Sequence, residues 1–206
     1  MGPYERFVLP HVINCACGTK PFMKQREKVV PQARGTVLEI GIGTGLNLPY
    51  YHDSSVDRLI GLDPSDRSWH LARKRLEQVS FPVEFVGLPG EQIPLEEDSI
   101  DTIVVTFSLC TIPDPVAALG GMRRVLKPDG QLLFAEHGRA PDEGVRRWQN
   151  RINGIWGLIA GGCQLNRDIP SLLEAGGFST TVLEEMYLPS TPKVAGYNYW
   201  GAASHA

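Results

Sequence analysis

An apolar run that leads directly into three alternating glycines is the feature that most constrains this chain. Val37–Ile40 has the composition of a buried strand, and Gly41, Gly43 and Gly45 follow it. Because glycine has no Cβ atom, the backbone can turn sharply here and approach a ligand more closely than other residues allow. The segment therefore predicts a strand that ends in a ligand-binding loop.

Further short β-branched runs alternate with helical patterns from Thr36 onward, which favours crossover units on a mostly parallel sheet. Only a proline-containing turn separates the last two runs, so we expect them to form an antiparallel C-terminal hairpin. The predicted fold class is α/β, a Rossmann-like doubly wound sheet of seven strands. These strands are Thr36–Ile40, Arg58–Leu62, Val83–Val86, Thr102–Thr106, Gln131–Ala135, Ser179–Glu184 and Ala195–Ala202.

Clear signals mark the predicted helices. Asp114 and Pro115 have the N-cap and first-position chemistry of a helix that runs to Leu126, and Lys127–Gly130 predicts a turn after it. A second helix should bury an apolar stripe and end at two glycines. The stripe consists of Val145, Trp148, Ile152, Ile155 and Ile159.

The first 35 residues predict two helices ahead of the first strand, one kinked and the other carrying Phe22, Arg26 and Val29 at helical spacing. We expect residues 1–35 to form an N-terminal helical cap and residues 36–206 to form a single compact domain. The length of the chain, 206 residues, is typical of about one domain.

Charge and cysteine content exclude several classes of function. The chain has 20 Lys and Arg against 23 Asp and Glu, so we expect no nucleic acid and no anionic membrane as partner. Cys15, Cys17, Cys110 and Cys163 show neither paired metal-ligand spacing nor a disulfide framework, which predicts reduced thiols and no metal site. The apolar stretch near the N-terminus is shorter than the ~20 residues of a membrane span. We therefore expect a cytoplasmic protein without an integral membrane segment.

Acidic residues near the glycines indicate which ligand the loop binds. Leu46 stands where a dinucleotide fingerprint requires its third glycine. Glu39 would oppose a pyrophosphate but suits an ammonium group, and Asp63 ends the second strand, where it can accept both hydroxyls of a ribose. Taken singly, Asp63 before Pro64 could open a helix and the glycines could serve a tight turn. Together they predict a nucleoside that carries a cationic amino acid.

These residues resemble the motifs of class I S-adenosylmethionine-dependent methyltransferases. Residues 88–94 are similar to the family's adenine-binding motif, although Pro89 replaces the usual aspartate, which favours Gly90 and Glu91 as the contacts. Residues 98–101 and 106–109 resemble the motif that lines the methyl-transfer site. The resemblance implies S-adenosylmethionine as cofactor and S-adenosylhomocysteine as product. It assigns cofactor binding to Glu39, Gly41, Gly43, Gly45, Asn47, Asp63, Pro64, Gly90, Glu91 and Thr106.

A closer resemblance concerns the acceptor. Residues 108–110, 136–138 and 162–168 look like the methyltransferase-like seven group, whose animal members are described as alkyl thiol S-methyltransferases. This implies a small thiol as the acceptor. Residues 1–35 do not resemble the hydrophobic N-terminal anchor of those animal proteins.

His137 follows the fifth strand and is the candidate catalytic residue, either to take a proton or to stabilise a thiolate. A structural hydrogen bond to a neighbouring loop explains it equally well. The candidate substrate residues are Tyr4, Phe22, Trp148 and Arg167. Helix packing is the alternative for the three aromatic residues, and a salt bridge with Asp168 or Glu136 is the alternative for Arg167.

The sequence thus predicts an enzyme that moves a methyl group from S-adenosylmethionine to a small apolar acceptor, with a thiol favoured. The first alternative keeps this donor and methylates a phospholipid amine or a quinone carbon. A second alternative, from another class, is a nucleotide-binding module without catalysis. The oligomeric state is left open.

Overall fold

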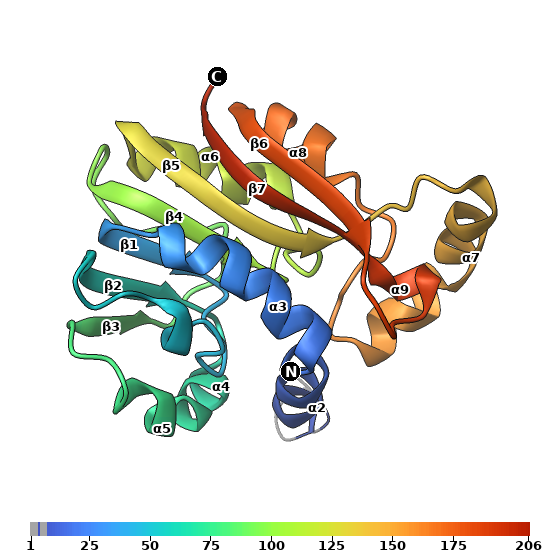
Figure 1. Ribbon diagram of the computed structural model, residues 1–206, viewed down its shortest axis with the longest axis horizontal. Coiled ribbons are helices and arrows are strands. Elements are labelled where there is room, and N and C mark those ends of the chain that lie inside the picture. The colour runs from blue at the N-terminus through green and yellow to red at the C-terminus, as the bar shows by residue number, and fades with distance from the viewer. Residues whose placement is uncertain (1–3, 5–7) are drawn as a thin grey trace.

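The computed structural model describes residue 4 and residues 8–206 (Figure 1). Its centre is a seven-stranded sheet in the order β3-β2-β1-β4-β5-β7-β6, in which β7 runs antiparallel to both β5 and β6 and the other pairs are parallel. The predicted α/β fold, the number of strands and the antiparallel end are therefore confirmed. The strands are β1 Gly35–Ile40, β2 Val56–Leu62, β3 Val83–Val86, β4 Ile100–Thr106, β5 Leu126–His137, β6 Phe178–Tyr187 and β7 Tyr197–His205.

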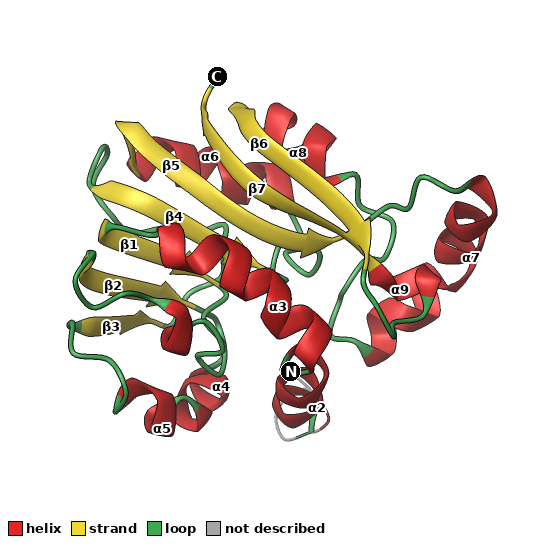
Figure 2. Cartoon of the chain, in the orientation of Figure 1, coloured by secondary structure: helices red, strands yellow, loops and turns green. Residues whose placement is uncertain are grey.

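Helices cover both faces of this sheet (Figure 2). They are α2 Leu9–Cys17, α3 Lys20–Val29, α4 Asp66–Leu71, α5 Arg73–Leu76, α6 Pro115–Val125, α7 Glu143–Ile159, α8 Ile169–Ala175 and α9 Lys193–Gly196, with short 3-10 turns at Val30–Gln32 and Leu48–Tyr50. Among the residues that the structure describes, no helix combines the length and the apolar character needed to cross a membrane.

Alternation along the central strands explains why both faces are covered. On β1, Val37 belongs to the apolar cluster on one side of the sheet and Leu38 to the cluster on the other. The same alternation separates Val104 from Val105 on β4. Successive side chains of a strand point to opposite faces, so parallel strands with apolar residues at successive positions require helices on both faces.

Helix α6 forms as its capping residues predict, but the turn after it differs. The Asp114 side chain accepts a hydrogen bond from the Ala117 amide at 3.0 Å, and Pro115 is the first helical residue. Strand β5 then begins at once, and residues 127–130 lie within it without partners on β4, because the register passes from Leu126 to Gln131. The expected turn is thus an irregularity inside a longer strand.

Two other expectations need correction. The last strand begins at Tyr197 instead of Ala195, because residues 193–196 form the short helix α9. The predicted apolar stripe of α7 is largely exposed, with Trp148, Ile155 and Ile159 at 58%, 70% and 55%. This helix extends from the body of the molecule (Figure 1).

A buried polar residue, together with Val145 of the stripe, holds α7 against the domain. Gln149 is the buried residue of this helix, and its amide nitrogen donates to the carbonyls of Gly138 and Val194. Its side-chain oxygen accepts from the Ala140 amide at 3.0 Å. Because a buried amide needs these partners, they select the face that turns inward.

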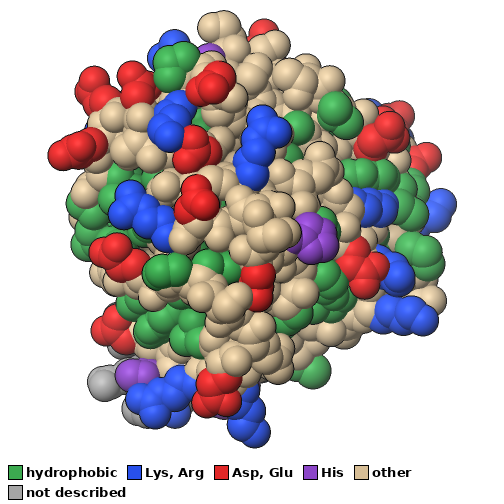
Figure 3. All heavy atoms as spheres, turned by 60° about the vertical axis from the view of Figure 1, so that its left-hand side comes forward, with side chains coloured by type: hydrophobic (Ala, Val, Ile, Leu, Met, Phe, Trp, Pro, Cys, Tyr) green, Lys and Arg blue, Asp and Glu red, His purple; other side chains and the backbone are tan. Residues whose placement is uncertain are grey.

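The second N-terminal helix belongs to the core of the sheet. Helix α3 lies across one face (Figure 1), and Val29 and Val30 join the same apolar cluster as Val37 of β1. The predicted boundary between an N-terminal cap and the main domain at residue 35 stays a prediction. On the surface, basic and acidic side chains are interspersed over the face shown in Figure 3.

The close pairing of β6 with β7 at Gly201 predicts that one added methyl group will strongly destabilise the protein. A Cβ atom at Gly201 would lie 1.9 Å from the Val182 carbonyl oxygen, where the register shifts. We expect Gly201→Ala to lower the free energy of unfolding by about 2 kcal/mol or more in urea titrations. The control is Gly120→Ala in α6, which meets nothing within 4 Å and should raise stability by about 0.5–1 kcal/mol. Equal effects of the two changes would contradict this view of the hairpin.

Candidate functional site

A cavity of about 370 Å³ opens where β1, β2 and β4 end. Four loop segments and the N-terminal helices build its wall. The loops contribute Gly41–Thr44, Leu62–Ser65, Pro89–Glu91 and Thr106–Ser108, and the helices contribute Leu9, Pro10, Ile13, Cys17 and Arg26. A concave, mostly apolar space of this size with a few polar groups is the usual form of a small-molecule site.

The glycine loop has the conformation that its sequence requires. Gly41, Gly43 and Gly45 have φ values of 73°, 51° and 72°, in the left-handed region that favours glycine. A Cβ atom at Gly41 would lie 2.1 Å from the Ser108 hydroxyl oxygen, whereas the nearest atoms at Gly43 would be 3.8 Å away. Gly43 therefore leaves open space for a ligand, and Gly45 packs against Leu48 instead of lining the cavity.

Asp63 joins the glycine loop to the next strand. One carboxylate oxygen accepts from the Gly43 amide at 3.0 Å, and the other accepts from the Ser65 amide at 2.8 Å. Burial raises the pKa of Asp63 to about 6, and the two hydrogen bonds oppose this rise. Its carboxylate is thus held in place at the cavity wall beside Pro64.

The structure places Glu39 and Asn47 behind the wall and not on it. The two oxygens of Glu39 accept from the Tyr51 hydroxyl at 2.7 Å and the Asn47 amide at 2.9 Å. Glu39 is only 2% exposed, and burial raises its pKa to about 7. A direct contact of this carboxylate with an ammonium group, as the sequence predicted, is not what the geometry offers.

Arg26 of α3 occupies the position nearer the cavity, and the sequence analysis did not assign it a role. Its guanidinium donates to Asn47 at 2.7 Å and to the Thr106 hydroxyl, and it lies over the Phe107 ring. Burial lowers its pKa, and its Nε atom is among the buried polar atoms of the described residues that lack a partner. A charge on the apolar stripe of a predicted helix was the signal that could have revealed it.

Most of the predicted cofactor residues come together. Those that line the cavity are Gly41, Gly43, Asp63, Pro64, Gly90, Glu91 and Thr106. The side chain of Glu91 accepts from the Asp114 amide at 3.2 Å, which ties the adenine-motif loop to the start of α6. Glu39, Gly45 and Asn47 support the wall from behind.

The predicted acceptor residues are more scattered. Phe22 packs edge-on against Phe107, a cavity residue, with ring centroids 4.9 Å apart. The Tyr4 hydroxyl donates to the Ile159 carbonyl at 2.7 Å, which links it to the end of α7. Trp148 is exposed on α7 and is not a cavity residue.

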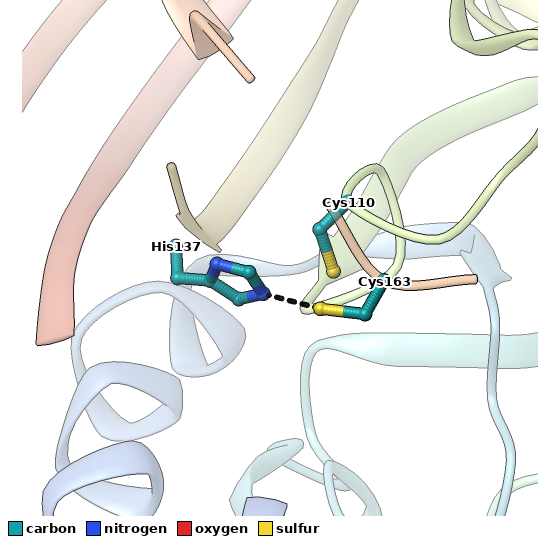
Figure 4. Close-up of side chains that lie close together, drawn as sticks. All are labelled: Cys110, His137 and Cys163. Carbon is teal, nitrogen blue, oxygen red and sulfur yellow. Dashed lines mark hydrogen bonds between the residues drawn. The ribbon is translucent and has the colours of Figure 1, made fainter. Parts of the chain in front are cut away.

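Arg167 and His137 lie behind the same wall. Arg167 donates to the Leu109 carbonyl, while its expected partner Asp168 pairs with Arg139 at 3.3 Å. His137 is buried, and its Nε2 atom lies 3.0 Å from the Cys163 sulfur (Figure 4). Its ring points toward this thiol and not into the cavity, so the structure does not bring it to the acceptor directly.

Comparisons with known proteins agree with this geometry. Residues 38–134 match a family model described as a methyltransferase domain. The human thiol S-methyltransferase TMT1B is 34% identical over 169 residues, which cover 78% of this chain and 68% of that protein. This chain belongs to the class I S-adenosylmethionine-dependent methyltransferases.

Other relatives share part of their length with this methyltransferase. The mitochondrial methyltransferase OMS1 of Saccharomyces cerevisiae is 29% identical over 82% of this chain, which spans only 39% of the yeast protein. Phosphatidylethanolamine N-methyltransferase of Cereibacter sphaeroides is 31% identical over 50% of this chain and 51% of its own. A methyltransferase from Aquifex aeolicus shares the fold, with a TM-score of 0.67 and 18% identity over 96% of this chain and 98% of that one.

S-adenosylmethionine is the cofactor of this family, and the cavity fits it. The open space at Gly43 admits a ligand to the backbone, and the Asp63 carboxylate borders the same space. The unpartnered Nε atom of Arg26 is a donor for a carboxylate such as that of the methionine part. The set of donors and acceptors therefore matches a nucleoside joined to an amino acid.

Burial of Glu39 predicts a pH effect on stability. Its pKa rises from 4.5 to about 7 on folding, so the folded protein holds this proton more tightly than the unfolded chain. The resulting stability is fully present below pH 4.5 and is lost as the pH rises through about 7, a change of about 3 kcal/mol. Urea unfolding of the wild type should show this loss, and Glu39→Gln should show a loss smaller by about this amount, because the part due to other buried carboxyl groups with a raised pKa, such as Asp63, remains.

The exposed Glu84 of β3 provides the matched control. Glu84→Gln should retain the wild-type pH dependence of unfolding. If Glu39→Gln also retained it, the buried carboxyl group would not be its source.

Proposed function

We propose that this methyltransferase transfers the methyl group of S-adenosylmethionine to the sulfur of a small apolar thiol. The observation that carries the proposal is the 34% identity with human thiol S-methyltransferase TMT1B, which extends over 78% of this chain. That similarity includes residues beyond the donor loop, which a shared cofactor alone would not require.

The walls of the cavity favour an apolar acceptor. Leu9, Ile13 and Phe107 line it together with the glycine loop. Such walls would exclude water and hold a small alkyl group by contact. The acceptor residues Phe22 and Tyr4 support these walls, Phe22 through the Phe107 ring and Tyr4 through the end of α7.

The protein's task in this reaction is mainly one of position. When bound, S-adenosylmethionine supplies a methyl group on a positively charged sulfur. Asp63 and the glycine loop would hold the nucleoside, and Arg26 would hold the carboxylate at the other end, so that the donor cannot rotate in the cavity. Fixed orientation of two reactants can lower a barrier by about 7–11 kcal/mol in favourable cases.

A thiol acceptor needs little further activation. Its pKa of about 8.5 leaves a few per cent as thiolate at neutral pH. His137 was the candidate for thiol activation. We propose that it acts indirectly, through its contact with the Cys163 thiol, and does not touch the acceptor. Arg167, which also lies there, would contribute positive charge toward an anionic acceptor.

Methylation of a phospholipid amine or a quinone carbon is the second candidate. It is favoured by the similarity to phosphatidylethanolamine N-methyltransferase of Cereibacter sphaeroides, which covers 50% of this chain. The matched region is shorter than that shared with the thiol enzyme. Membership of a methyltransferase family argues against a module that only binds nucleotides.

Removal of the Asp63 carboxylate should weaken cofactor binding. Asp63→Ala would lose two charge-assisted hydrogen bonds to the ribose, and we expect an affinity about a hundredfold lower in titration calorimetry. Asp57→Ala on the same strand changes an exposed carboxylate and serves as the control. An unchanged affinity in Asp63→Ala would remove this residue from the cofactor site.

The acceptor can be identified by its product. We expect the pure protein to form S-adenosylhomocysteine with hydrogen sulfide or alkyl thiols, and not with alcohols of the same chain length, because alcohols do not ionise near neutral pH. Amines and quinones should give only background rates. Turnover with an amine or a quinone but with none of the thiols would overturn the proposal.

A further inference from the structure

Three side chains with soft donor atoms meet behind the wall of the cavity. Cys110 follows β4, His137 ends β5, and Cys163 follows α7, and all three are buried. Their ligand atoms lie within 4.8 Å of one another (Figure 4). The cluster lies outside the residues assigned to the cofactor, and the methyl transfer proposed above does not account for its composition.

We propose that Cys110, His137 and Cys163 form a binding site for Zn²⁺. Two thiolates and one imidazole are the donor set that favours this ion, with Zn–S distances of about 2.3 Å and Zn–N distances of about 2.0 Å. Tetrahedral angles at those lengths place neighbouring ligand atoms about 3.5–3.8 Å apart. The three ligand atoms, which all lie within 4.8 Å of one another, are therefore nearly at the spacing that one ion requires.

Hydrogen bonds already hold the ligand-bearing segments together. Glu136, next to His137, accepts from the amides of Ser108 and Leu109 at 2.6 and 2.9 Å, just before Cys110. The amide of Gln164, next to Cys163, donates to the Cys110 carbonyl at 2.8 Å. A metal would thus enter a preformed arrangement, with little backbone to order on binding.

Charge balance supports the assignment. Before the acceptor binds, two thiolates cancel the charge of a divalent cation, so the complex with a neutral imidazole is uncharged, which suits a buried position. The Arg167 guanidinium, which interacts with both cysteines, would balance the charge of a third thiolate. The Trp156 indole nitrogen lies 3.3 Å from the Cys163 sulfur, where it donates to that sulfur. A donor of this kind is typical of the outer shell that stabilises a metal-bound thiolate.

The described residues supply only three metal ligands here, which leaves one tetrahedral position. Thr111 and Gly161, close in sequence to Cys110 and Cys163, line the cavity, so the segments that carry the two cysteines form part of its wall. Zinc sites with three protein ligands bind water or substrate at the fourth position. We assign that position to the acceptor thiol, a step that rests on the proposed function.

The reaction balances with the ion as a fixed Lewis acid. The acceptor thiol binds Zn²⁺ as a thiolate and releases its proton to water. The acceptor sulfur then forms a bond to the methyl carbon while the bond from that carbon to the donor sulfonium breaks. The products are a thioether and S-adenosylhomocysteine, and no oxidant or reductant is needed.

Metal binding is tested directly with Zn²⁺ and its spectroscopic substitute Co²⁺. Wild-type protein purified without chelator should contain about one zinc ion per chain by mass spectrometry of the elements. Co²⁺ should give the absorption of a tetrahedral site with thiolate ligands. Cys163→Ser and Cys110→Ser should lose both signals, whereas Cys15→Ser, which changes an exposed cysteine of α2, should keep them.

Wild-type protein alone provides a measurement that does not depend on the folding of the variants. Zinc should raise its melting temperature, because a ligand that binds only the folded state stabilises it, and a chelator should reverse the rise. No bound zinc and no cobalt spectrum in reduced wild-type protein would overturn the site. A disulfide between Cys110 and Cys163 in place of metal would overturn it as well.

The two proposals fail separately. Metal binding without turnover of any thiol would leave the site intact and contradict the proposed function. Thiol methylation at an undiminished rate in metal-free protein would support the function and contradict the role of the fourth position. A loss of at least about tenfold in kcat on chelation, restored by Zn²⁺, is the expected result.

Discussion

The site depends on a change of direction in the sheet. From β1 the chain builds outward through β2 and β3, then returns to the other side of β1 as β4. Loops that follow β1 and β4 therefore leave the sheet toward opposite faces, and a crevice remains between them. The glycine loop, Asp63 and Thr106 all lie at this one edge of the sheet, although Gly41 and Thr106 are 65 residues apart in sequence. The loop residues can bind a ligand only because this topology leaves a space between them.

A line of buried polar groups supports the crevice from within. Glu39 binds Asn47, Asn47 binds Arg26, and Arg26 reaches Thr106 on the neighbouring strand. Such groups are costly to bury singly but stable when each has a partner. The acidic residue of the first motif therefore positions Asn47, and the guanidinium of Arg26 is the charged group of this line that reaches the cavity.

The sequence allowed the sheet to be predicted well, because strands buried on both faces have uninterrupted apolar runs such as Ile103–Val105. It predicted α7 as a helix but not the exposure of its stripe, since an apolar stripe does not reveal whether a partner surface exists, and Gln149 determines which face turns inward. Arg26 had a local signal, a charge on an apolar stripe, to which no role was given, whereas the cluster of Cys110, His137 and Cys163 was missed for another reason. Their spacing along the chain has no local pattern, and only the tertiary fold brings them together.

Helix α3 links the two ends of the chain to the cofactor. It presents Arg26 to the cavity, yet it rests on the far end of the sequence, where the Lys28 ammonium lies 3.4 Å from the centre of the Trp200 ring on β7. One wall of the cavity thus rests partly on the last strand to be made, in addition to the apolar cluster that Val29 and Val30 share with β1. The wall is complete only once β7 has paired, so a change in β7 can disturb the cavity without altering any residue that lines it.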